Sequence, residues 1–358
     1  MRILYLGYQS ISLDDSGGAL GCIRNYTSIR RVCGEENLKT VILKNTSQPS
    51  FWQKMFNNLC RILFKDAFDY RLAYKEIFSE YDVIFIDSSR LGNMAKRIVK
   101  SGFKGDIIIF FHNFDYKFVT GLHKDAGRLK LWINKRVSLE NERNAVKYAT
   151  KNIVLNLRDA QELKDFYGLK NYYVIPVSLP DRYSENLVYK DPYNRNHGKI
   201  FLFLGSYFFG NTVGLDWFMM NVYPKVNINL VIVGKDMHKL KNKSLYKDVQ
   251  IYSDVDDVTP YVVYADCMLF PIFGGSGMKI KTCESLMFGK NIIGTHEAFE
   301  GYELDFEKVG ACCSNEDEFV AAINNFKMER YNNYSREVYI KKYSFDATLK
   351  LFNQILNN

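Results

Sequence analysis

The chain has 358 residues, of which 47% are hydrophobic and 25% are charged, as in ordinary soluble globular proteins. This length favours about two domains rather than one core. The formal net charge of +8 is unevenly placed, since residues up to Glu185 hold 29 Lys and Arg against 20 Asp and Glu, and the remainder holds 19 against 20. The basic first half is expected either to meet an anionic partner or membrane surface, or simply to be a solvated basic face.

Composition also excludes several classes of protein. The seven cysteines, among them the adjacent Cys312 and Cys313, show no repeated spacing, which predicts buried thiols in a reducing compartment. No pair has zinc-ligand spacing, so no structural metal is expected. Residues 1–7 are expected to form a first strand rather than a signal peptide. No run approaches the ~20 apolar residues that a spanning helix needs. We therefore expect a cytoplasmic protein, with no indication of nucleic-acid binding.

The first half alternates short β-branched and aromatic runs with helical stretches, which predicts a parallel sheet with crossover helices. Its strands are expected at 2–6, 40–43, 83–86, 106–110, 152–155 and 172–175. Residues 181–198 are polar and carry prolines and asparagines, so they are expected to link two domains. The first domain would then span residues 1–180.

The second half repeats this alternation, with strands expected at 200–204, 229–233, 249–252, 267–270 and 291–293. A second domain is therefore expected at 199–340, with closing helices at 316–326 and 345–357. The last segment, 341–358, could cross back to the first domain. Two similar α/β domains in tandem predict a ligand site in a cleft between them, beyond the carboxyl ends of the strands.

The strongest functional signal lies in residues 270–294. A predicted strand ends at Pro271, a glycine loop follows, and a helical pattern is expected from 277 to 288. The glycines of the loop are Gly274, Gly275 and Gly277. Lys281 and Glu284 are expected on one helix face with Gly277, where free N–H groups and the helix dipole favour an anion. The alternative is a surface ion pair of Lys281 with Glu284, worth less than ~1 kcal/mol.

The segment from Gly275 to Glu284, with residues 289–295 and 300–301, resembles the donor-binding segment of retaining glycosyltransferases of family 4, which have the GT-B fold. Residues 203–206, 211, 217–218 and 223–224 look like the first strand, loop and helix of the same nucleotide-binding domain. Residues 231–234 and 254–257 look like the region near which the family holds the base. The resemblance implies an α/β, GT-B architecture: two Rossmann-like domains facing across a cleft, the second binding the nucleotide sugar and the first the acceptor.

Roles in the donor site follow from this resemblance. The expected donor-binding residues are Gly205, Asn211, Gly275, Ser276, Gly277, Met278, Lys281 and Glu284. Lys281 would contact the diphosphate and Glu284 the ribose hydroxyls. Ser276 stands where many relatives carry the first of two glutamates eight positions apart. The alternative for the 205–211 loop is a plain strand-to-helix turn, with Asn211 or Thr212 as the N-cap.

Two features of the first half complete the expected site. His112 follows the strand at 106–110, and the resemblance implies that it faces the donor sugar, so His112, Lys281 and Glu284 are the candidate catalytic residues. Gly17 and Gly18, before a helix predicted from near Leu20, are expected to form an acceptor or phosphate loop. No metal or other cofactor is expected, because Lys281, loop amides and the helix dipole can stabilise the departing diphosphate.

Residues 51–65 are unusually apolar for a connecting helix, with basic residues interspersed. Trp52, Met55, Phe56, Leu59 and Leu63 recur at helical spacing. The pattern fits a helix buried on the sheet, or an interfacial helix in peripheral contact with the inner face of the cell membrane. The second interpretation agrees with a lipid-linked acceptor.

The sequence thus predicts a retaining, hexosyltransferase-like glycosyltransferase that passes a sugar from a nucleotide-diphosphate donor to a glycan or lipid-linked acceptor, in bacterial surface polysaccharide synthesis. The alternatives are a nucleotide-sugar epimerase or hydrolase, and a non-catalytic nucleotide-sugar-binding partner of another transferase. A nicotinamide oxidoreductase is disfavoured, because the Gly-x-Gly-x-x-Gly fingerprint is absent from the sequence.

Overall fold

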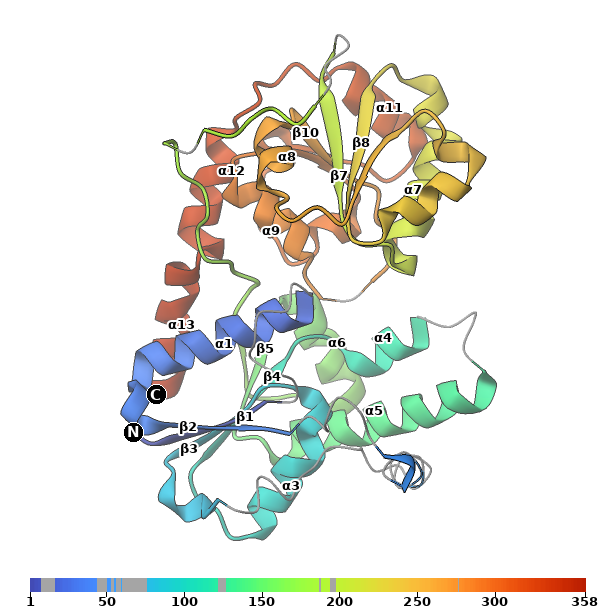
Figure 1. The fold of residues 1–358 in the computed structure, drawn as a ribbon. Helices are drawn as coiled ribbons and strands as arrows, with labels where there is room; N and C mark the ends of the chain where they lie inside the picture. Colours follow the sequence, from blue (N-terminus) through green and yellow to red (C-terminus); the bar gives the residue numbers. More distant parts are fainter. Residues whose placement is uncertain are drawn as a thin grey trace. The chain divides into compact units, whose positions relative to one another are not determined.

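The computed structural model describes residues 1–7, 17–43, 50–52, 55, 59, 76–121, 127–186, 188–193, 198–275 and 277–358. The chain divides into two compact units. The first consists of Met1–Pro176 with Thr348–Asn358, and the second of Val177–Ala347. Each unit holds a six-stranded, all-parallel sheet with helices between its strands (Figure 1).

The first sheet has the order β2-β1-β3-β4-β5-β6. Its strands are β1 (Ile3–Gly7), β2 (Leu38–Ile42), β3 (Val83–Ile86), β4 (Asp106–Phe111), β5 (Lys151–Val154) and β6 (Tyr172–Val174). Strands β1 and β3 are buried along their whole length, whereas the outer strands β2 and β6 are partly exposed. This burial explains the continuous apolar runs in the sequence, because helices cover both faces of a parallel sheet.

The helices of the first unit are α1 (Gly17–Cys33), α3 (Gly92–Lys100), α4 (Asp115–Gly121), α5 (Arg128–Tyr148) and α6 (Leu157–Tyr167). Helix α6 shows how local sequence sets these boundaries. The Asn156 side chain accepts the N–H of Asp159 at 2.8 Å, and Gly168 ends the helix in the left-handed conformation. At the end of the chain, Phe352 is buried in the first unit, with its ring 6.4 Å from that of Phe85.

The second sheet has the order β12-β11-β10-β7-β8-β9. Its strands are β7 (Ile200–Leu204), β8 (Asn229–Gly234), β9 (Gln250–Ser253), β10 (Cys267–Phe270), β11 (Asn291–Gly294) and β12 (Gly310–Cys312). The strands predicted at 83–86, 200–204 and 267–270 are confirmed to the residue. The sequence did not indicate β12, because Gly-Ala-Cys is short, lacks β-branched residues and lies partly exposed at the sheet edge.

The helices that follow β7 are α7 (Phe209–Asn221), α8 (Thr259–Tyr264), α9 (Ile280–Met287), α10 (Phe306–Val309), α11 (Glu316–Asn324), α12 (Asn333–Val338) and α13 (Phe345–Asn357). The described part of segment 181–198 packs on the second unit. The Tyr193 hydroxyl donates to the carbonyl of Tyr261 at 2.6 Å, and the Arg336 guanidinium donates to both carboxylate oxygens of Asp181 at 2.9 and 2.6 Å.

Candidate functional site

The second sheet reverses its strand order between β7 and β10. Strands β8 and β9 lie on one side of β7, in chain order. Strand β10 lies on the other side of β7 and is followed there by β11 and β12. Ligands of open α/β sheets bind beyond the carboxyl ends of the strands at such a switch point. Gly205 directly follows β7, and the glycine loop directly follows β10. The fold therefore brings together the two loops that the sequence singled out.

Three of the predicted donor-site residues meet at this point. The Lys281 ammonium nitrogen donates to Asn211 Oδ1 at 2.7 Å, and Asn211 Nδ2 donates to the carbonyl of Ser206 at 2.8 Å. A Cβ at Gly205 would lie 2.7 Å from Lys281 Nζ and 3.0 Å from Asn211 Nδ2. Only a glycine at position 205 therefore leaves Lys281 and Asn211 undisturbed.

Asn211 does not cap a helix. Helix α7 begins at Phe209, with Phe208 as its N-cap, so Asn211 and Thr212 both lie inside its first turn. The expectation of an N-cap at either residue is therefore wrong. Because its carboxamide is held between Lys281 and Ser206, Asn211 orients the lysine side chain across the loop.

The Lys281 amine lies against two aromatic rings, and the residue is only partly exposed. Its nitrogen is 4.5 Å from the ring centroid of Phe203 and 5.6 Å from that of Phe270. Burial lowers the pKa of Lys281 to about 7, and the charge of Lys279 adds to this effect. At neutral pH the amine is thus divided between its neutral and charged forms, and an arriving anion would favour the charged one.

The helix after the glycine loop begins later than predicted. Helix α9 starts at Ile280 rather than at Gly277, because Gly277 has a φ of +62°, in the left-handed region that a right-handed helix cannot continue. Gly275, with a φ of +154°, also has a backbone that side chains rarely allow. Ser276, between them, lies outside the described residues. Lys279 Nζ pairs with Glu297 Oε1 at 2.6 Å and donates to the Gly277 carbonyl at 3.0 Å.

Met278 is 6% exposed, and its sulfur accepts the N–H of Val177 at 3.4 Å. The side chain is therefore buried. A contact between Met278 and a bound sugar remains a prediction.

Glu284 does not pair with Lys281, so the surface ion pair considered as an alternative is wrong. Its carboxylate accepts instead from the guanidinium of Arg182, and the Glu284 side chain is only 12% exposed. Burial raises the pKa of Glu284, while Arg182 opposes that rise. Sequence reasoning missed Arg182, which lies 102 positions away in a polar segment with no motif around it.

The region expected near the base contains a compact turn. Asp254 has a φ of +55° and accepts the N–H of Asp236 at 2.9 Å. Its other carboxylate oxygen accepts from Ser253 and lies 3.3 Å from His238 Nδ1. These bonds lower the pKa of Asp254, the Ser253 hydroxyl having the largest effect. They fix the turn that follows β9.

In the first unit the strand order reverses between β1 and β3. His112 follows β4, and its Nε2 lies 3.0 Å from Asp87 Oδ1 and 3.7 Å from Cys22 Sγ. The sequence did not indicate Asp87 or Cys22 as neighbours of His112. Gly17 and Gly18 are the first two residues of α1, so the helix begins earlier than the expected start near Leu20. Their role as an acceptor or phosphate loop stays a prediction.

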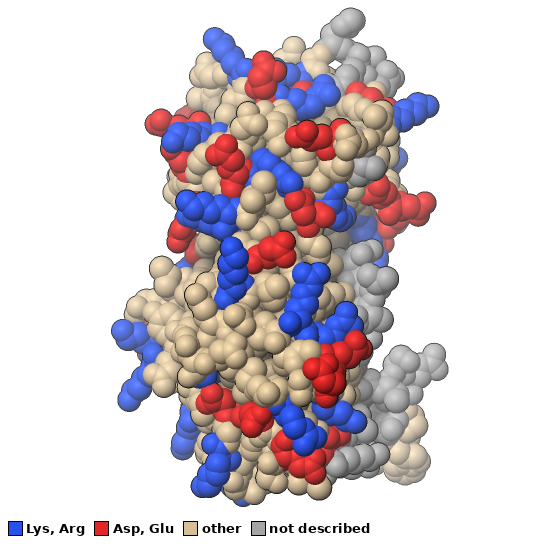
Figure 2. Space-filling view, turned by 90° about the vertical axis from the view of Figure 1, so that its left-hand side faces the viewer, with Lys and Arg blue, Asp and Glu red and all other residues tan. Residues whose placement is uncertain are grey.

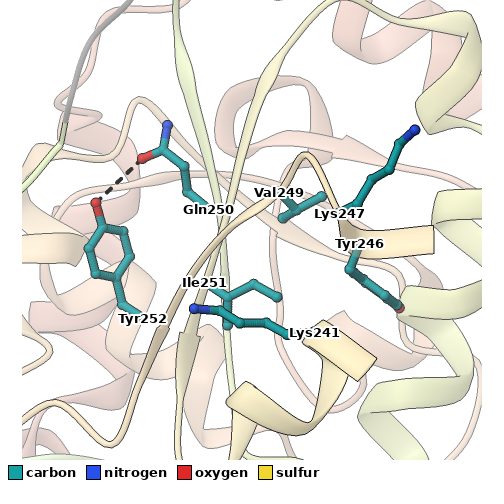
Figure 3. A pocket seen from close by; sticks show the side chains of 7 residues that line it. All are labelled: Lys241, Tyr246, Lys247, Val249, Gln250, Ile251 and Tyr252. Carbon is teal, nitrogen blue, oxygen red and sulfur yellow. Dashed lines mark hydrogen bonds between the residues drawn. The ribbon is translucent and has the colours of Figure 1, made fainter. Parts of the chain in front are cut away.

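A separate hollow of about 450 Å³ lies at the edge strand β9 (Figure 3). It is lined by Lys241, Tyr246, Lys247, Val249, Gln250, Ile251 and Tyr252. Figure 3 shows the Tyr252 hydroxyl linked to Gln250, at 3.4 Å. None of the predicted site residues lines this hollow, and its lining includes neither the glycine loop nor Lys281. We therefore place the candidate site at the ends of β7 and β10.

Within 51–65, the structure describes only Phe51, Trp52, Met55 and Leu59, and all four are more than half exposed. The rest of the segment lies outside the described residues. Among the helices that the described residues form, none is both long and apolar enough to cross a bilayer. Figure 2 shows Lys and Arg interspersed with Asp and Glu on the face it draws, so positive charge is not gathered there.

Comparison with known proteins agrees with this geometry. Residues 198–326 match a family model described as Glycosyl transferases group 1. No curated protein sequence matches the chain. The structure is similar to sucrose-phosphate synthase from Thermosynechococcus elongatus, with a TM-score of 0.71 and 12% identity over 100% of this chain and 98% of that one.

Two further solved structures are similar over nearly all of both chains. The lipopolysaccharide outer core galactosyltransferase WaaB has a TM-score of 0.67 and 16% identity, with 99% of each chain covered. The Anabaena protein HepE, in complex with UDP and glucose, has a TM-score of 0.65 and 12% identity, with 100% of each chain covered. At such identities the likeness shows the fold alone. The chain therefore has the GT-B fold, and its residues 198–326 match the family model of Glycosyl transferases group 1.

Proposed function

We propose that this protein is a retaining glycosyltransferase that moves a sugar from a nucleotide-diphosphate sugar to a glycan or lipid-linked acceptor. The observation that carries the proposal is the convergence of Gly205, Asn211 and Lys281 at the β7/β10 switch point. The match of residues 198–326 to a glycosyltransferase family supports it. HepE, which has the same fold, holds UDP and UDP-glucose in its solved structures.

In this proposal the donor diphosphate lies against the loops that follow β7 and β10. Lys281 supplies a positive charge, and N–H groups at the start of α9 supply hydrogen bonds. Gly205 and Gly275 let the backbone approach the phosphates closely. As the sugar departs, negative charge grows on the diphosphate, and these fixed groups stabilise it. They can serve as the charge sink without a divalent metal.

Glu284 is suited to accept hydrogen bonds from the two ribose hydroxyls. Its carboxylate is largely buried and accepts from Arg182, which opposes the rise in pKa that burial causes. A carboxylate in such a site binds hydroxyl groups strongly, because charged acceptors form stronger hydrogen bonds than neutral ones. Arg182 then shares the carboxylate with the ribose, since a carboxylate offers about four acceptor positions.

The first unit would hold the acceptor, with His112 near the transferred sugar. A role in bacterial surface polysaccharide synthesis is consistent with the description of WaaB as a lipopolysaccharide galactosyltransferase. The exposed side chains of Phe51 and Trp52 would support peripheral contact with the inner face of the cell membrane. The protein would then act in the cytoplasm, at that surface.

The donor site is tested by ligand-induced stabilisation. A panel of UDP-, GDP-, ADP- and dTDP-sugars is screened by thermal unfolding, and a true donor at 100 times its Kd should stabilise the fold by about 2.7 kcal/mol. Lys281→Ala and Glu284→Ala should each lose this shift, whereas Lys225→Ala, in an exposed ion pair with Glu316, should keep it. Full stabilisation of both site variants would refute the assignment.

The reaction is tested with the donor that the panel identifies. Transfer to acceptor, followed by NMR of the new linkage, should show the anomeric configuration of the donor. Donor consumption without any acceptor would instead indicate a hydrolase or epimerase, and binding without turnover would indicate a non-catalytic partner.

Membrane contact has its own test, in which anionic vesicles are sedimented with the protein. Trp52→Glu should reduce binding, whereas Val188→Glu, at an apolar residue that is 93% exposed, should not. Equal binding of the two variants would refute contact through this segment.

A further inference from the structure

The carboxyl ends of β3 and β4 bring three metal-binding side chains together in the first unit. Cys22 comes from α1, Asp87 directly follows β3, and His112 directly follows β4. One ligand atom from each residue lies within 4.8 Å of the other two. Cys22 and Asp87 are almost fully buried, and the His112 side chain is 13% exposed. We propose that Cys22, Asp87 and His112 bind one thiophilic divalent cation of the Zn²⁺ type.

The distances suit a tetrahedral ion with little movement. Around Zn²⁺, bonds of about 2.3 Å to sulfur and about 2.0–2.2 Å to nitrogen and oxygen place S and N about 3.6 Å apart, and N and O about 3.4 Å apart. Here Cys22 Sγ is 3.7 Å from His112 Nε2, which is 3.0 Å from Asp87 Oδ1. Shifts of a few tenths of an ångström in these two separations would therefore admit the ion.

The charge of the site also favours a cation. Asp87 is fully buried, and its partners among the described residues are Tyr5, Asn25 and His112. Neither Tyr5 nor Asn25 brings a positive charge. A buried carboxylate is stabilised by a charged partner, and a divalent ion bound to a carboxylate and a thiolate is neutralised by them. Binding would replace the proton on His112 Nε2 and that on Cys22 Sγ.

A second set of contacts would orient these ligands. The Tyr5 hydroxyl donates to Asp87 Oδ2, and Asn25 Nδ2 donates to Asp87 Oδ1 at 2.5 Å. Such outer contacts fix the carboxylates and imidazoles of metal sites. The Asn25 Oδ1 atom is buried and has no hydrogen-bond partner in the part of the chain that the structure describes.

This inference does not depend on the proposed function, and it is tested by binding alone. Co²⁺ is titrated into the reduced, full-length protein after chelator treatment, and the thiolate-to-cobalt charge-transfer absorption is recorded. One equivalent should bind and should be displaced by Zn²⁺. Cys22→Ala and His112→Gln should each weaken binding roughly 100-fold or more. Cys33→Ala, at the other end of α1, should behave like the unchanged protein.

Circular dichroism is used to check that each variant is folded, and a rise in melting temperature with Zn²⁺ provides a second measurement. The rise should appear in Cys33→Ala and be absent from Cys22→Ala. A charge-transfer band that survives in Cys22→Ala would place the ion elsewhere and overturn the proposal. Absence of any band in the unchanged protein would overturn it as well.

Discussion

Lys281 should couple donor binding to proton uptake. Burial and the charge of Lys279 lower the pKa of Lys281 from 10.5 to about 7, a difference of about 5 kcal/mol between its protonation states. A diphosphate beside the amine favours the charged form and raises this pKa again. At pH 8 about nine in ten free molecules hold a neutral amine, so binding should take up nearly one proton. At pH 6 about nine in ten are already charged, so uptake should be close to zero.

The same shift sets how the stability of the free protein depends on pH. Between about pH 7 and 10.5 the unfolded chain holds a proton on Lys281 that the folded chain has released. The contribution of Lys281 to the free energy of unfolding therefore rises with pH across this window, and it is least favourable below pH 7. Lys281→Met removes this dependence, so the variant should gain most stability at low pH, measured by urea unfolding at pH 6 and 9.

Calorimetry tests the coupling directly. Binding of the nucleotide sugar is measured at pH 6 and 8 in two buffers with different ionisation enthalpies, which reports the protons taken up. A nucleotide sugar is preferable to UDP, because a terminal phosphate itself titrates near pH 6. The affinity of the unchanged protein should fall above pH 7, by up to about tenfold per pH unit.

The Lys281→Met variant should show no uptake at pH 8 and should bind roughly 10- to 100-fold more weakly at pH 6, as expected for the loss of a contact to a charged group. The control is Lys225→Met, which removes an exposed lysine paired with Glu316 at 2.8 Å and should retain the uptake. Equal proton uptake by Lys281→Met and the unchanged protein would refute the reasoning.

Substitutions at three further positions probe the candidate site and the helix beside it. Gly205→Ala should fold but lose donor affinity roughly tenfold or more, because its Cβ displaces the flexible end of Lys281, and calorimetry measures the loss. Gly214→Ala should instead destabilise the fold by about 1–3 kcal/mol, measured by urea unfolding, because its Cβ would lie 1.7 Å from a backbone carbonyl. Arg182→Ala should raise the pKa of Glu284, so on acidification this variant should lose donor binding at a higher pH than the unchanged protein does. Arg182→Lys should restore the pH dependence of the unchanged protein. An unchanged pH profile in Arg182→Ala would exclude this role.

Much of the fold could be predicted from the sequence, because buried parallel strands appear in it as short apolar runs. The runs at 83–86 and 267–270 match β3 and β10 to the residue, and the glycine loop after β10 is where the candidate site was predicted. The start of α9 was less accessible. The spacing of apolar residues predicts a helix that starts at Gly277. The positive φ of Gly277 is incompatible with a right-handed helix, and α9 starts at Ile280 instead. Periodicity reports which side chains are buried, but not the backbone conformation of a glycine.

Only the tertiary structure decided which side chains meet. Lys281 and Glu284 are three residues apart, yet one bonds Asn211 and the other Arg182, which lie 70 and 102 positions away. The cluster around His112 likewise joins a helix and two strand ends that local spacing cannot relate. The sequence by itself determined the alternation of strands and helices and the residue types at their ends, because burial and turn chemistry are local. The partners of those residues depend on strand order, and strand order exists only in the folded sheet.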